Sequence, residues 1–588
     1  MRDNQDSEMI KVAAAVPQVR LAQPMANAEA CLELIREAHA GSVNVICFPL
    51  LTLTGYTAGD LLCNALLIDK SAEALKWLAR RTSGLTPLAV VGLPLLKDGK
   101  LYNAMAFIKG GRVLGYRVEP NPSQRWFSGL SEGKGFSQVR EVVDSGLGRR
   151  FPVSVAFPGE LENEKARFKG IVLCPQAIEG RVGAHGSVTA GLAGLTSRCR
   201  CTAVLASAGK GESSTDYWYP GFAVVAQNGL SLYSSSPFCG LAVCGISTAP
   251  VPVTAAPALP MGEEGISADP FMCCDTLRKA REAFAIQCGA LRTRLEHTGI
   301  RRLVIGVSGG LDSTLALLAC ARTLDSMGLP RKNLVGITMP GFGTTDRTYS
   351  NAVNMMKALE IEWREINIKE ACLLHLRDIG HDPAVHDSAY ENAQARERTQ
   401  ILMDVANETG ALVVGTGDLS ELALGWCTYN GDHMSMYAVN GGIPKTAIQH
   451  IIRYVAENEL NESVKPFLFD VIDTPISPEL LPGGTVTQKT EDIIGPYRLH
   501  DFFIWHFMGE CRSPREISEL AAGAFAGEYS RDEINRWLKL FLKRFFSQQF
   551  KRSCMPDGPD VFGISLSPRG GWTMPSDVSS ALWTEDIC

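Results

Sequence analysis

The stretch GVSGGLDST, residues 306–314, follows the apolar run RRLVI and joins it to a helix that we expect to begin near Ser313. Gly309 and Gly310 lack a Cβ, so the backbone can approach an anion closely. The first amides of a helix direct a partial positive charge at such a ligand. A strand, a glycine-rich loop and a helix in this order predict a phosphate-binding loop in an α/β domain.

The loop differs from the common phosphate motif, which ends in Gly-Lys-Ser or Gly-Lys-Thr. Asp312 stands within it instead, and a bare carboxylate repels phosphate unless a metal ion bridges the two groups. Ser308, Ser313 and Thr314 add hydroxyl donors. The stretch therefore predicts a nucleotide bound together with Mg²⁺. The alternative is a glycine-rich turn in which a serine and an aspartate only cap a helix.

Short apolar strands alternate with amphipathic helices on both sides of this loop, which predicts an α/β fold. The capping-box spacing of Ser530 and Glu533 predicts the start of a last amphipathic helix. We expect strands at residues 10–16, 43–48, 88–94, 301–307, 333–339 and 411–417, and helices at 25–39, 269–297 and 352–359.

The domain division follows from length and composition. A chain of 588 residues exceeds what one hydrophobic core usually serves. Between residues 248 and 268 the sequence becomes rich in Pro, Ala and Gly, which cannot hold a helix or a central strand. We therefore expect a domain at residues 1–247, a linker at 248–268 and a second domain at 269–588.

Bulk composition excludes several classes of protein. The net charge of -6 argues against a general nucleic-acid binder, which needs a basic face for phosphates. Residues 1–19 carry acids where a signal peptide is basic, and prolines interrupt the long uncharged span 228–262, so no membrane helix is expected. We expect a cytoplasmic protein whose 17 cysteines are reduced and hold no structural zinc.

The second half of the chain resembles a known family. SGGLDST after a strand is similar to the loop of the N-type ATP pyrophosphatases, and residues 415–446, GTGDLSELALGWCTYNGDHMSMYAVNGGIPKT, resemble the substrate segment of NAD synthetases. The stretches YENAQARERTQIL, VIDTPISPELLP, FKRS and LSPRGGW resemble further blocks of that family. The resemblance implies a Rossmann-like domain with a helical C-terminal section. It also implies that deamido-NAD is adenylated by ATP and that ammonia then displaces AMP.

This resemblance implies roles for individual residues. Adenylyl transfer concentrates negative charge, so cations must be fixed where that charge develops. Asp312 and Lys445 would be catalytic, and Asp312 and Glu421 would bind Mg²⁺. ATP would contact Gly306, Val307, Ser308, Gly309, Gly310, Leu311, Asp312, Ser313, Thr416 and Lys445. Deamido-NAD would contact Asn392, Glu421, Trp426, Cys427, Thr428, Tyr429 and Lys551.

The first 250 residues resemble the nitrilase-like amidase domain that precedes the synthetase in glutamine-dependent NAD synthetases. The similar stretches are KVAAAVPQV, TGYTAGDLL, LYNAMAFIKGGRVLG and RWFSGL. The resemblance implies an α/β/β/α sandwich, a homo-oligomeric assembly, and ammonia that travels from amidase to synthetase. The family's amidase uses a Glu base, a Cys nucleophile and a Lys that stabilises the oxyanion, because a protonated thiol is a weak nucleophile.

All three positions differ here. Leu50, in FPLL, stands where the family has the glutamate of Phe-Pro-Glu, and no lysine occurs between Lys109 and Lys134; Arg117 lies in that interval. Cys174 stands at the nucleophile position, but Pro-Gln follows it where the family has Glu-Asp. We therefore predict a degenerate amidase in which Cys174 is only vestigial. The nitrogen would come from ammonia, free or delivered by a separate donor protein, rather than from glutamine.

Three other interpretations remain. The chain could be a glutamine-hydrolysing NAD synthetase in which Glu119 or Glu179 replaces the missing base. It could be a scaffold that binds a nucleotide without turnover, although Ser308, Asp312 and Lys445 form part of an apparently complete set. A different pyrophosphatase-type synthetase is disfavoured by the stretch SELALGW and by the lack of a basic surface that would bind tRNA.

Overall fold

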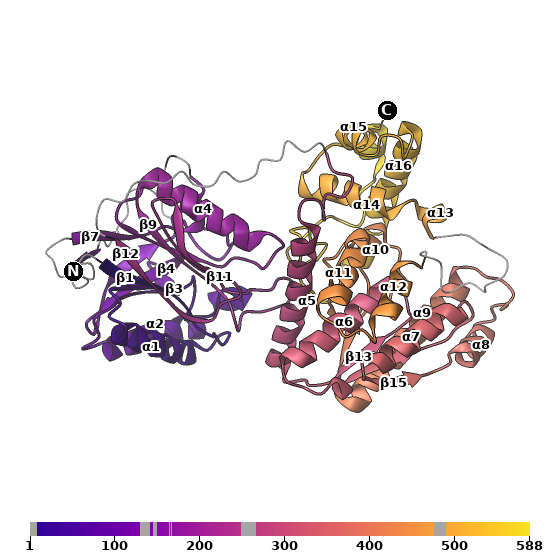
Figure 1. Ribbon diagram of the computed structural model, residues 1–588, viewed down its shortest axis with the longest axis horizontal. Helices are drawn as coiled ribbons and strands as arrows, with labels where there is room; N and C mark the ends of the chain where they lie inside the picture. The colour runs from indigo at the N-terminus through magenta and orange to yellow at the C-terminus, as the bar shows by residue number, and fades with distance from the viewer. Residues whose placement is uncertain are drawn as a thin grey trace. The chain divides into compact units, whose positions relative to one another are not determined.

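The structure is a computed structural model that describes residues 9–129, 141–144, 150–163, 165, 167–247, 266–474 and 490–587 (Figure 1). It forms two compact units. Unit 1 consists of Met1–Ser213 and Tyr219–Met261, and unit 2 of Ser214–Trp218 and Gly262–Cys588. The predicted linker lies almost wholly outside the described residues, so its position stays a prediction.

Unit 1 contains two six-stranded sheets packed face to face. The first sheet has the order β12 (Gly240–Ser247), β1 (Met9–Val16), β2 (Val45–Cys47), β3 (Leu88–Lys97), β4 (Lys100–Lys109), β5 (Arg112–Val118). The second has the order β11 (Leu230–Ser235), β10 (Ala223–Gln227), β9 (Thr202–Ser207), β8 (Ile171–Gln176), β7 (Arg150–Val155), β6 (Glu141–Asp144).

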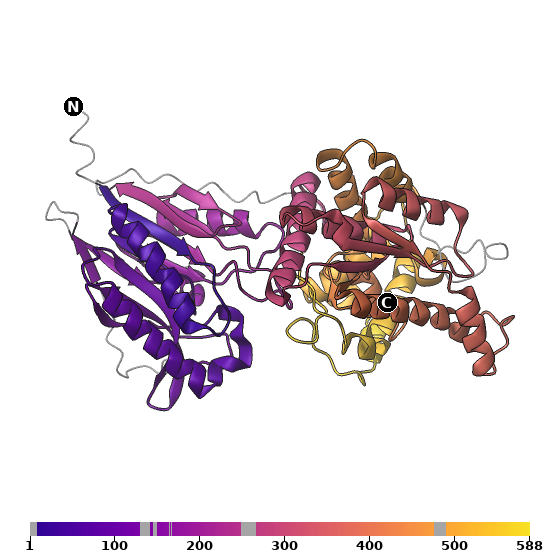
Figure 2. The same ribbon diagram turned by 90° about the horizontal axis from the view of Figure 1, so that it is seen from below.

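Helices cover the outer faces of both sheets. The helices α1 (Pro24–Ala40) and α2 (Ala65–Arg81) pack on the first sheet, and Figure 2 shows them lying along its outer face. The helix α4 (Ala184–Cys199) covers the second sheet. The short helices η2 (Tyr56–Cys63) and α3 (Pro158–Leu161) lie in connections. The predicted α/β/β/α sandwich is confirmed.

The strand β1 shows why its sequence is almost continuously apolar. Val12 and Ala14 point into the core between the two sheets, whereas Ala13 and Ala15 point toward the helices. Because both faces of this central strand are buried, polar residues have no exposed side to occupy.

Unit 2 is built on a five-stranded parallel sheet, as predicted for a Rossmann-like domain. Its order is β15 (Glu362–Glu365), β14 (Leu334–Thr338), β13 (Leu303–Gly306), β16 (Leu412–Gly415), β17 (Tyr437–Ala438). The helices up to β17 are α5 (Thr276–Thr298), α6 (Leu311–Ser326), η3 (Arg331–Asn333), α7 (Asp346–Ala358), α8 (Lys369–Asp378), α9 (Ser388–Thr409) and α10 (Leu419–Leu424).

The remainder of unit 2 is helical, as the sequence predicts. Its helices are α11 (Lys445–Asn458), α12 (Lys465–Ile472), α13 (Thr490–Ile494), α14 (Tyr497–Ile504), η4 (Trp505–Gly509), α15 (Pro514–Ala524), α16 (Arg531–Ser547), α17 (Gln549–Arg552) and α18 (Ala581–Glu585). The Ser530 hydroxyl accepts from the Glu533 amide, and the Glu533 carboxylate accepts from the Ser530 amide, which confirms the capping box.

Some predicted helix boundaries are wrong. The helix expected at 269–297 begins at Thr276, because the Asp275 side chain accepts a bond from the Arg278 amide and caps the helix there. The helix expected at 352–359 begins at Asp346, where Thr345 is the N-cap. The helix after the phosphate loop, by contrast, begins at Leu311, close to the start predicted near Ser313.

The segment Ser214–Trp218 belongs to unit 2, although its neighbours in sequence belong to unit 1. The Tyr437 hydroxyl donates to the Ser214 carbonyl at 2.9 Å, and the Gly558 amide donates to the Thr215 carbonyl at 2.9 Å. These bonds tie the segment to β17 and to the end of the helical section. Nothing in the sequence pattern indicates this placement.

Other expectations concern cysteines and membranes. The cysteines that the structure describes are free thiols, as expected. No group of possible metal ligands among the described residues includes a cysteine. Within the described ranges, no helix combines the length and the apolar character needed to cross a bilayer.

Candidate active site

The predicted phosphate loop lies between the end of β13 and the start of α6. Gly309 has a φ of +89°, and a Cβ there would lie 2.1 Å from the Thr348 carbonyl oxygen, so no larger residue fits. The Ser308 hydroxyl accepts from the Gly310 amide at 3.2 Å, and Ser313 Oγ accepts from the Ser308 amide at 3.3 Å. The loop is therefore a tightly held turn with the first amides of α6 at its end.

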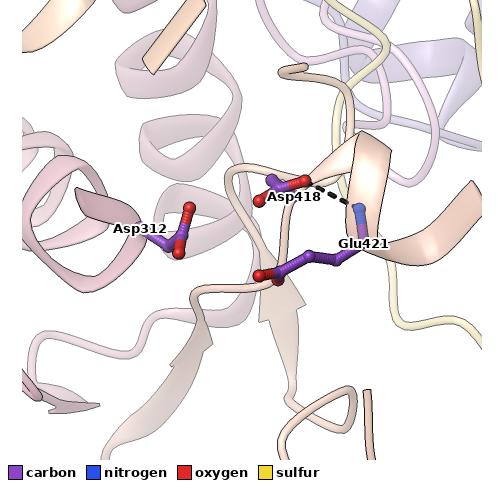
Figure 3. A group of neighbouring side chains, drawn as sticks. All are labelled: Asp312, Asp418 and Glu421. Carbon is purple, nitrogen blue, oxygen red and sulfur yellow. Dashed lines mark hydrogen bonds between the residues drawn. The ribbon is translucent and has the colours of Figure 1, made fainter. Parts of the chain in front are cut away.

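Three carboxylates meet at this end of the sheet: Asp312 from the first turn of α6, and Asp418 and Glu421 from the start of α10. Their ligand oxygens all lie within 4.8 Å of one another, and Figure 3 shows the side chains directed toward one another. Asp418 also accepts a bond from the Glu421 amide at 2.9 Å, which makes it the N-cap of α10. Oxygen ligands of this kind suit Mg²⁺.

The ammonium of Lys445 lies within the carboxylate group. Its Nζ is 2.8 Å from both carboxylate oxygens of Asp312, 2.7 Å from Asp418 and 2.8 Å from Glu421. Lys445 is only 3% exposed and is the first residue of α11, where the helix dipole disfavours a cation. The carboxylates compensate for that unfavourable position.

Burial and charge shift the protonation of this group. Burial raises the pKa of Asp418 well above its usual value, and the nearby charge of Glu421 raises it further. Burial also raises the pKa of Glu421, to about 7. Burial alone would lower the pKa of Lys445, but the carboxylates of Asp312, Asp418 and Glu421 raise it well above its usual value. Lys445 is therefore a permanent cation here.

Thr416 is brought to the same place by a buried amide. The Asn440 Nδ2 group donates to the Asp312 carbonyl at 2.9 Å and to the Thr416 carbonyl at 3.0 Å. Gln287 of α5 donates in turn to the Asn440 side chain at 2.8 Å. These bonds join the loop after β16 to the start of α6.

The predicted dinucleotide-binding residues lie beyond α10. The Thr428 hydroxyl donates to Asn392 Oδ1 at 2.7 Å, so these two predicted residues, 36 positions apart, are in contact. Tyr429 is 44% exposed and stacks on His433 at 5.3 Å between ring centroids. The Trp426 ring lies 5.2 Å from the Arg544 guanidinium carbon.

The ammonium of Lys551 is already engaged by the backbone. It donates to the Gly425 carbonyl at 2.8 Å and to the Cys427 carbonyl at 2.7 Å. Burial lowers its pKa. Burial also raises the pKa of the Cys427 thiol, to about 12. Lys551 therefore holds the segment that follows α10 in shape.

Sequence reasoning missed several residues that build this site. Asp418 could have been found, because an Asp three positions before Glu at a helix start is a capping pattern. Asn440, Tyr497, Asp501 and Arg552 had no such signal, since their partners are distant in sequence.

Unit 1 places the predicted amidase positions in its core. Leu50 is buried in the apolar layer between the two sheets. Cys174 is fully buried within β8 and packs with Leu192 and Leu195 of α4, on the outer side of the second sheet. Burial raises the pKa of this thiol well above its usual value. A thiol in this state is protonated at neutral pH.

The polar groups near the predicted amidase site have other partners. Arg117 forms an ion pair with Glu160 at 2.5 Å. Glu119 is buried and accepts from Asn103 Nδ2 at 2.8 Å; burial chiefly raises its pKa. Glu179 pairs with Arg181 at 2.6 Å.

Comparison with known proteins agrees with both units. The family model described as NAD synthase matches residues 284–521, and the one described as carbon-nitrogen hydrolase matches residues 11–131. A crystal structure of a glutamine-dependent NAD(+) synthetase from Cytophaga hutchinsonii superimposes with a TM-score of 0.79 at 18% identity, covering 98% of this chain and 100% of that one. The structure of the glutamine-dependent NAD+ synthetase from Acinetobacter baumannii in complex with ADP superimposes with a TM-score of 0.66 at 20% identity. It covers 95% of this chain and 97% of that one.

Curated relatives match over nearly the whole chain. The glutamine-dependent NAD(+) synthetase of Mycobacterium leprae is 34% identical over 673 aligned positions, which include 98% of this chain and 97% of the relative. That of Aquifex aeolicus is 24% identical, and the match covers 93% of this chain and 96% of the relative. The Mycobacterium leprae alignment is longer than this chain of 588 residues, so this chain lacks segments that the relative has.

The two folds and the carboxylate-lysine site thus define a ligase that joins a carbon-nitrogen hydrolase fold to an NAD synthase fold. The enzyme forms carbon-nitrogen bonds. The chain belongs to the family of glutamine-dependent NAD(+) synthetases, which confirms the resemblance found in its sequence.

Proposed function

We propose that this enzyme makes NAD from deamido-NAD and ATP and takes its nitrogen from ammonia. The nicotinate carboxylate attacks the α-phosphorus of ATP and expels pyrophosphate. Ammonia then attacks the acyl carbon of the adenylate and expels AMP. The observation that carries the synthetase assignment is the cluster of Asp312, Glu421 and Lys445 at the end of the phosphate loop.

The loop and Lys445 supply the positive charge that this chemistry needs. Backbone amides at the start of α6 bind the phosphates, and Thr416 lies beside them on the loop after β16. Lys445 is fixed where negative charge develops on the reacting phosphate. Buried in the protein, such a cation is more effective than in water because the surrounding dielectric constant is low.

Asp312 and Glu421 would hold Mg²⁺, and the oxygen of Asp418 lies close enough to join them. The all-carboxylate donor set fits this ion. When bound, Mg²⁺ neutralises and polarises the phosphate oxygens.

The residues around Thr428 would bind deamido-NAD. Asn392 and Thr428 are held together by their hydrogen bond, and the exposed ring of Tyr429 offers a face for stacking. Glu421 and Trp426 flank this segment, and Cys427 lies within it. Lys551 supports the segment through its carbonyls rather than through a free ammonium.

The state of Cys174 supports ammonia as the nitrogen donor. A nucleophilic thiol needs a base or a lowered pKa, whereas Cys174 is buried among apolar side chains and its pKa is raised. Leu50 cannot accept a proton, and Arg117 is occupied by Glu160. The ammonia would be free or supplied by another protein.

A second candidate is retained because the relatives are named glutamine-dependent. Glu119 is a buried carboxyl group with a raised pKa, which is a property of general bases. In this reading Glu119 would replace the missing glutamate, and glutamine would remain a nitrogen source.

One assay separates these functions. The purified full-length protein is given deamido-NAD, ATP and Mg²⁺ with either ammonium or glutamine, and NAD is measured with a dehydrogenase. We expect NAD with ammonium only. Equal rates with both donors would refute the loss of glutaminase activity, and loss of the glutamine rate in Glu119→Gln would then identify the base. No NAD from either donor would favour a nucleotide-binding scaffold.

A further inference from the structure

Asp501 on α14 links the two elements that carry Glu421 and Lys445. Its carboxylate is 1% exposed and accepts from the Thr446 amide at 2.9 Å and from the Thr446 hydroxyl at 2.8 Å. It also accepts a bond from the Ser420 hydroxyl. Ser420 directly precedes Glu421, and Thr446 directly follows Lys445.

Ser420 closes the network. Its oxygen accepts from the Lys445 backbone amide at 2.9 Å while its hydroxyl donates to Asp501. The starts of α10 and α11 are therefore joined both directly and through one carboxylate. Any shift of one helix start relative to the other stretches a buried hydrogen bond.

The same helix covers Lys445 from another side. Tyr497 lies four residues before Asp501, which is about one helical turn. The Lys445 ammonium lies 5.2 Å from the centre of the Tyr497 ring, within the range of a cation–π contact. The helix α14 therefore forms a wall of the carboxylate-lysine cluster.

Burying the Asp501 carboxylate costs free energy, because the charged group loses its water. Among the described residues its partners are two hydroxyls and one amide rather than a cation, so no ion pair within that part of the chain offsets its desolvation. A carboxylate can, however, accept several bonds at once from two elements. Burial chiefly raises its pKa, to about 6.

We propose that Asp501 is a positioning residue of the synthetase site, which fixes Lys445 and Glu421 at a set separation through Thr446 and Ser420. This rests on the proposed synthetase function of that site. Asp501 does not contact the ammonium of Lys445 or the carboxylate of Glu421 directly. It acts on them through Thr446 and Ser420. Residues that orient a metal or catalytic ligand usually contribute about 10–100-fold to activity.

The test compares variants at saturating ammonium in the full-length protein. We expect Asp501→Ala to lower kcat about 10–100-fold and to change KM for deamido-NAD much less, because Glu421 is the only predicted deamido-NAD contact that directly follows a residue bonded to Asp501. Asp501→Asn keeps one side-chain oxygen that accepts hydrogen bonds and has a polar NH2 group in place of the other oxygen. It should therefore retain more activity than Asp501→Ala. Ser420→Ala and Thr446→Val each remove one end of the link and should lower kcat less.

His500→Leu is the matched control. His500 is fully buried on the same helix; its ring contacts the Ile494 carbonyl at 2.7 Å and lies 6.0 Å from the rings of Phe503 and Phe541 between centroids. We expect this variant to lower the melting temperature and leave kcat unchanged. Wild-type kcat in Asp501→Ala would overturn the proposal. If that variant does not fold, unchanged kcat in both Ser420→Ala and Thr446→Val would overturn it instead.

The synthetase function can fail separately. If the wild-type protein makes no NAD from ammonium, the proposed function is wrong. If the wild type is active and the linking variants are too, only the role of Asp501 is wrong.

Discussion

Single residues set the chemistry of this enzyme at two places. In unit 2, Lys445 is surrounded by three carboxylates, which stabilise its buried charge together with the ring of Tyr497. In unit 1, Leu50 and Cys174 are the positions at which we propose that the amidase site is lost: Leu50 is apolar, and burial raises the pKa of the Cys174 thiol well above its usual value. Substitutions in the cluster of unit 2 should therefore lower the rate of NAD formation strongly, whereas a substitution of Cys174 should leave that rate unchanged.

Asp312→Asn should lower NAD formation from ammonium by about 100-fold or more, since one carboxylate that holds Lys445 and would bind Mg²⁺ is lost. The measurement is the initial rate at saturating substrates. Cys174→Ala is the control, and its rate should equal that of the wild type. A large loss in Cys174→Ala would contradict the vestigial role of that thiol.

His500 should make stability depend on pH. Burial lowers its pKa to about 4 from an ordinary 6.5, so the unfolded chain binds a proton between these values and the folded protein does not. Stability is therefore lost as pH falls from about 6.5 toward 4, by at most about 1.4 kcal/mol per pH unit.

Denaturant unfolding at pH 7 and pH 5 measures this effect. Asp501 acts in the opposite direction, because its folded pKa of about 6 lies above its ordinary value and favours the folded state as pH falls. The difference between wild type and His500→Leu isolates the histidine. An equal pH dependence in both proteins would contradict the prediction.

At the scale of elements, the short helix α10 is held at both ends. Asp418 caps its N-terminus, and Arg552 donates from Nη1 to the carbonyls of Leu422 at 3.1 Å and Ala423 at 3.0 Å. Arg544 donates to the Leu424 carbonyl at 2.9 Å. A helix of six residues is too short to be stable alone, so these partners fix the place of Glu421.

Arg552→Met should therefore destabilise unit 2. The guanidinium is fully buried, and its removal leaves several carbonyls without donors, at a cost of at least about 2 kcal/mol. KM for deamido-NAD should rise as well, because the segment after α10 loosens. Denaturant unfolding and steady-state kinetics measure the two effects. Arg531→Met, at an exposed position of α16, is the control, and equal stability of the two variants would contradict the prediction.

At the scale of the whole molecule, the two units are not two uninterrupted pieces of chain. Ser214–Trp218 is part of unit 2. Asp216 in this segment accepts from the Ser567 hydroxyl at 2.6 Å and pairs with Arg569 at 2.8 Å. A Cβ on Gly289 of α5 would lie 2.4 Å from the Trp218 ring, so this glycine lets the indole pack directly on the helix.

Trp218→Ala should loosen α5 without loosening unit 1. The lost contact is expected to cost up to about 3 kcal/mol. Hydrogen exchange of the full-length protein, read on peptides from α5 and from β1, measures the two units separately. Trp77→Ala, which removes a partly buried indole from the core beneath α2, should have the reverse effect. Unchanged exchange in α5 of Trp218→Ala would contradict the role of the segment.

The sequence by itself determined the local elements and the groups that sit on them. Alternating apolar runs predicted the strands, and the glycine-rich loop with Asp312 marked the edge of the parallel sheet. Resemblance added Glu421 and Lys445, and the structure brings all three together although Asp312 and Lys445 are 133 positions apart. Periodicity and caps are visible in sequence because they depend on neighbours within a few residues.

Only the tertiary structure decided which distant groups support the site. The link from Asp501 to Thr446 spans 55 positions, and that from Arg552 to Leu422 spans 130. The tertiary structure also decided that the Lys551 ammonium donates to two carbonyls and that Cys174 lies beneath α4. It further placed Ser214–Trp218 in unit 2. Such contacts arise when whole helices pack, and a buried polar residue takes the partner that packing supplies.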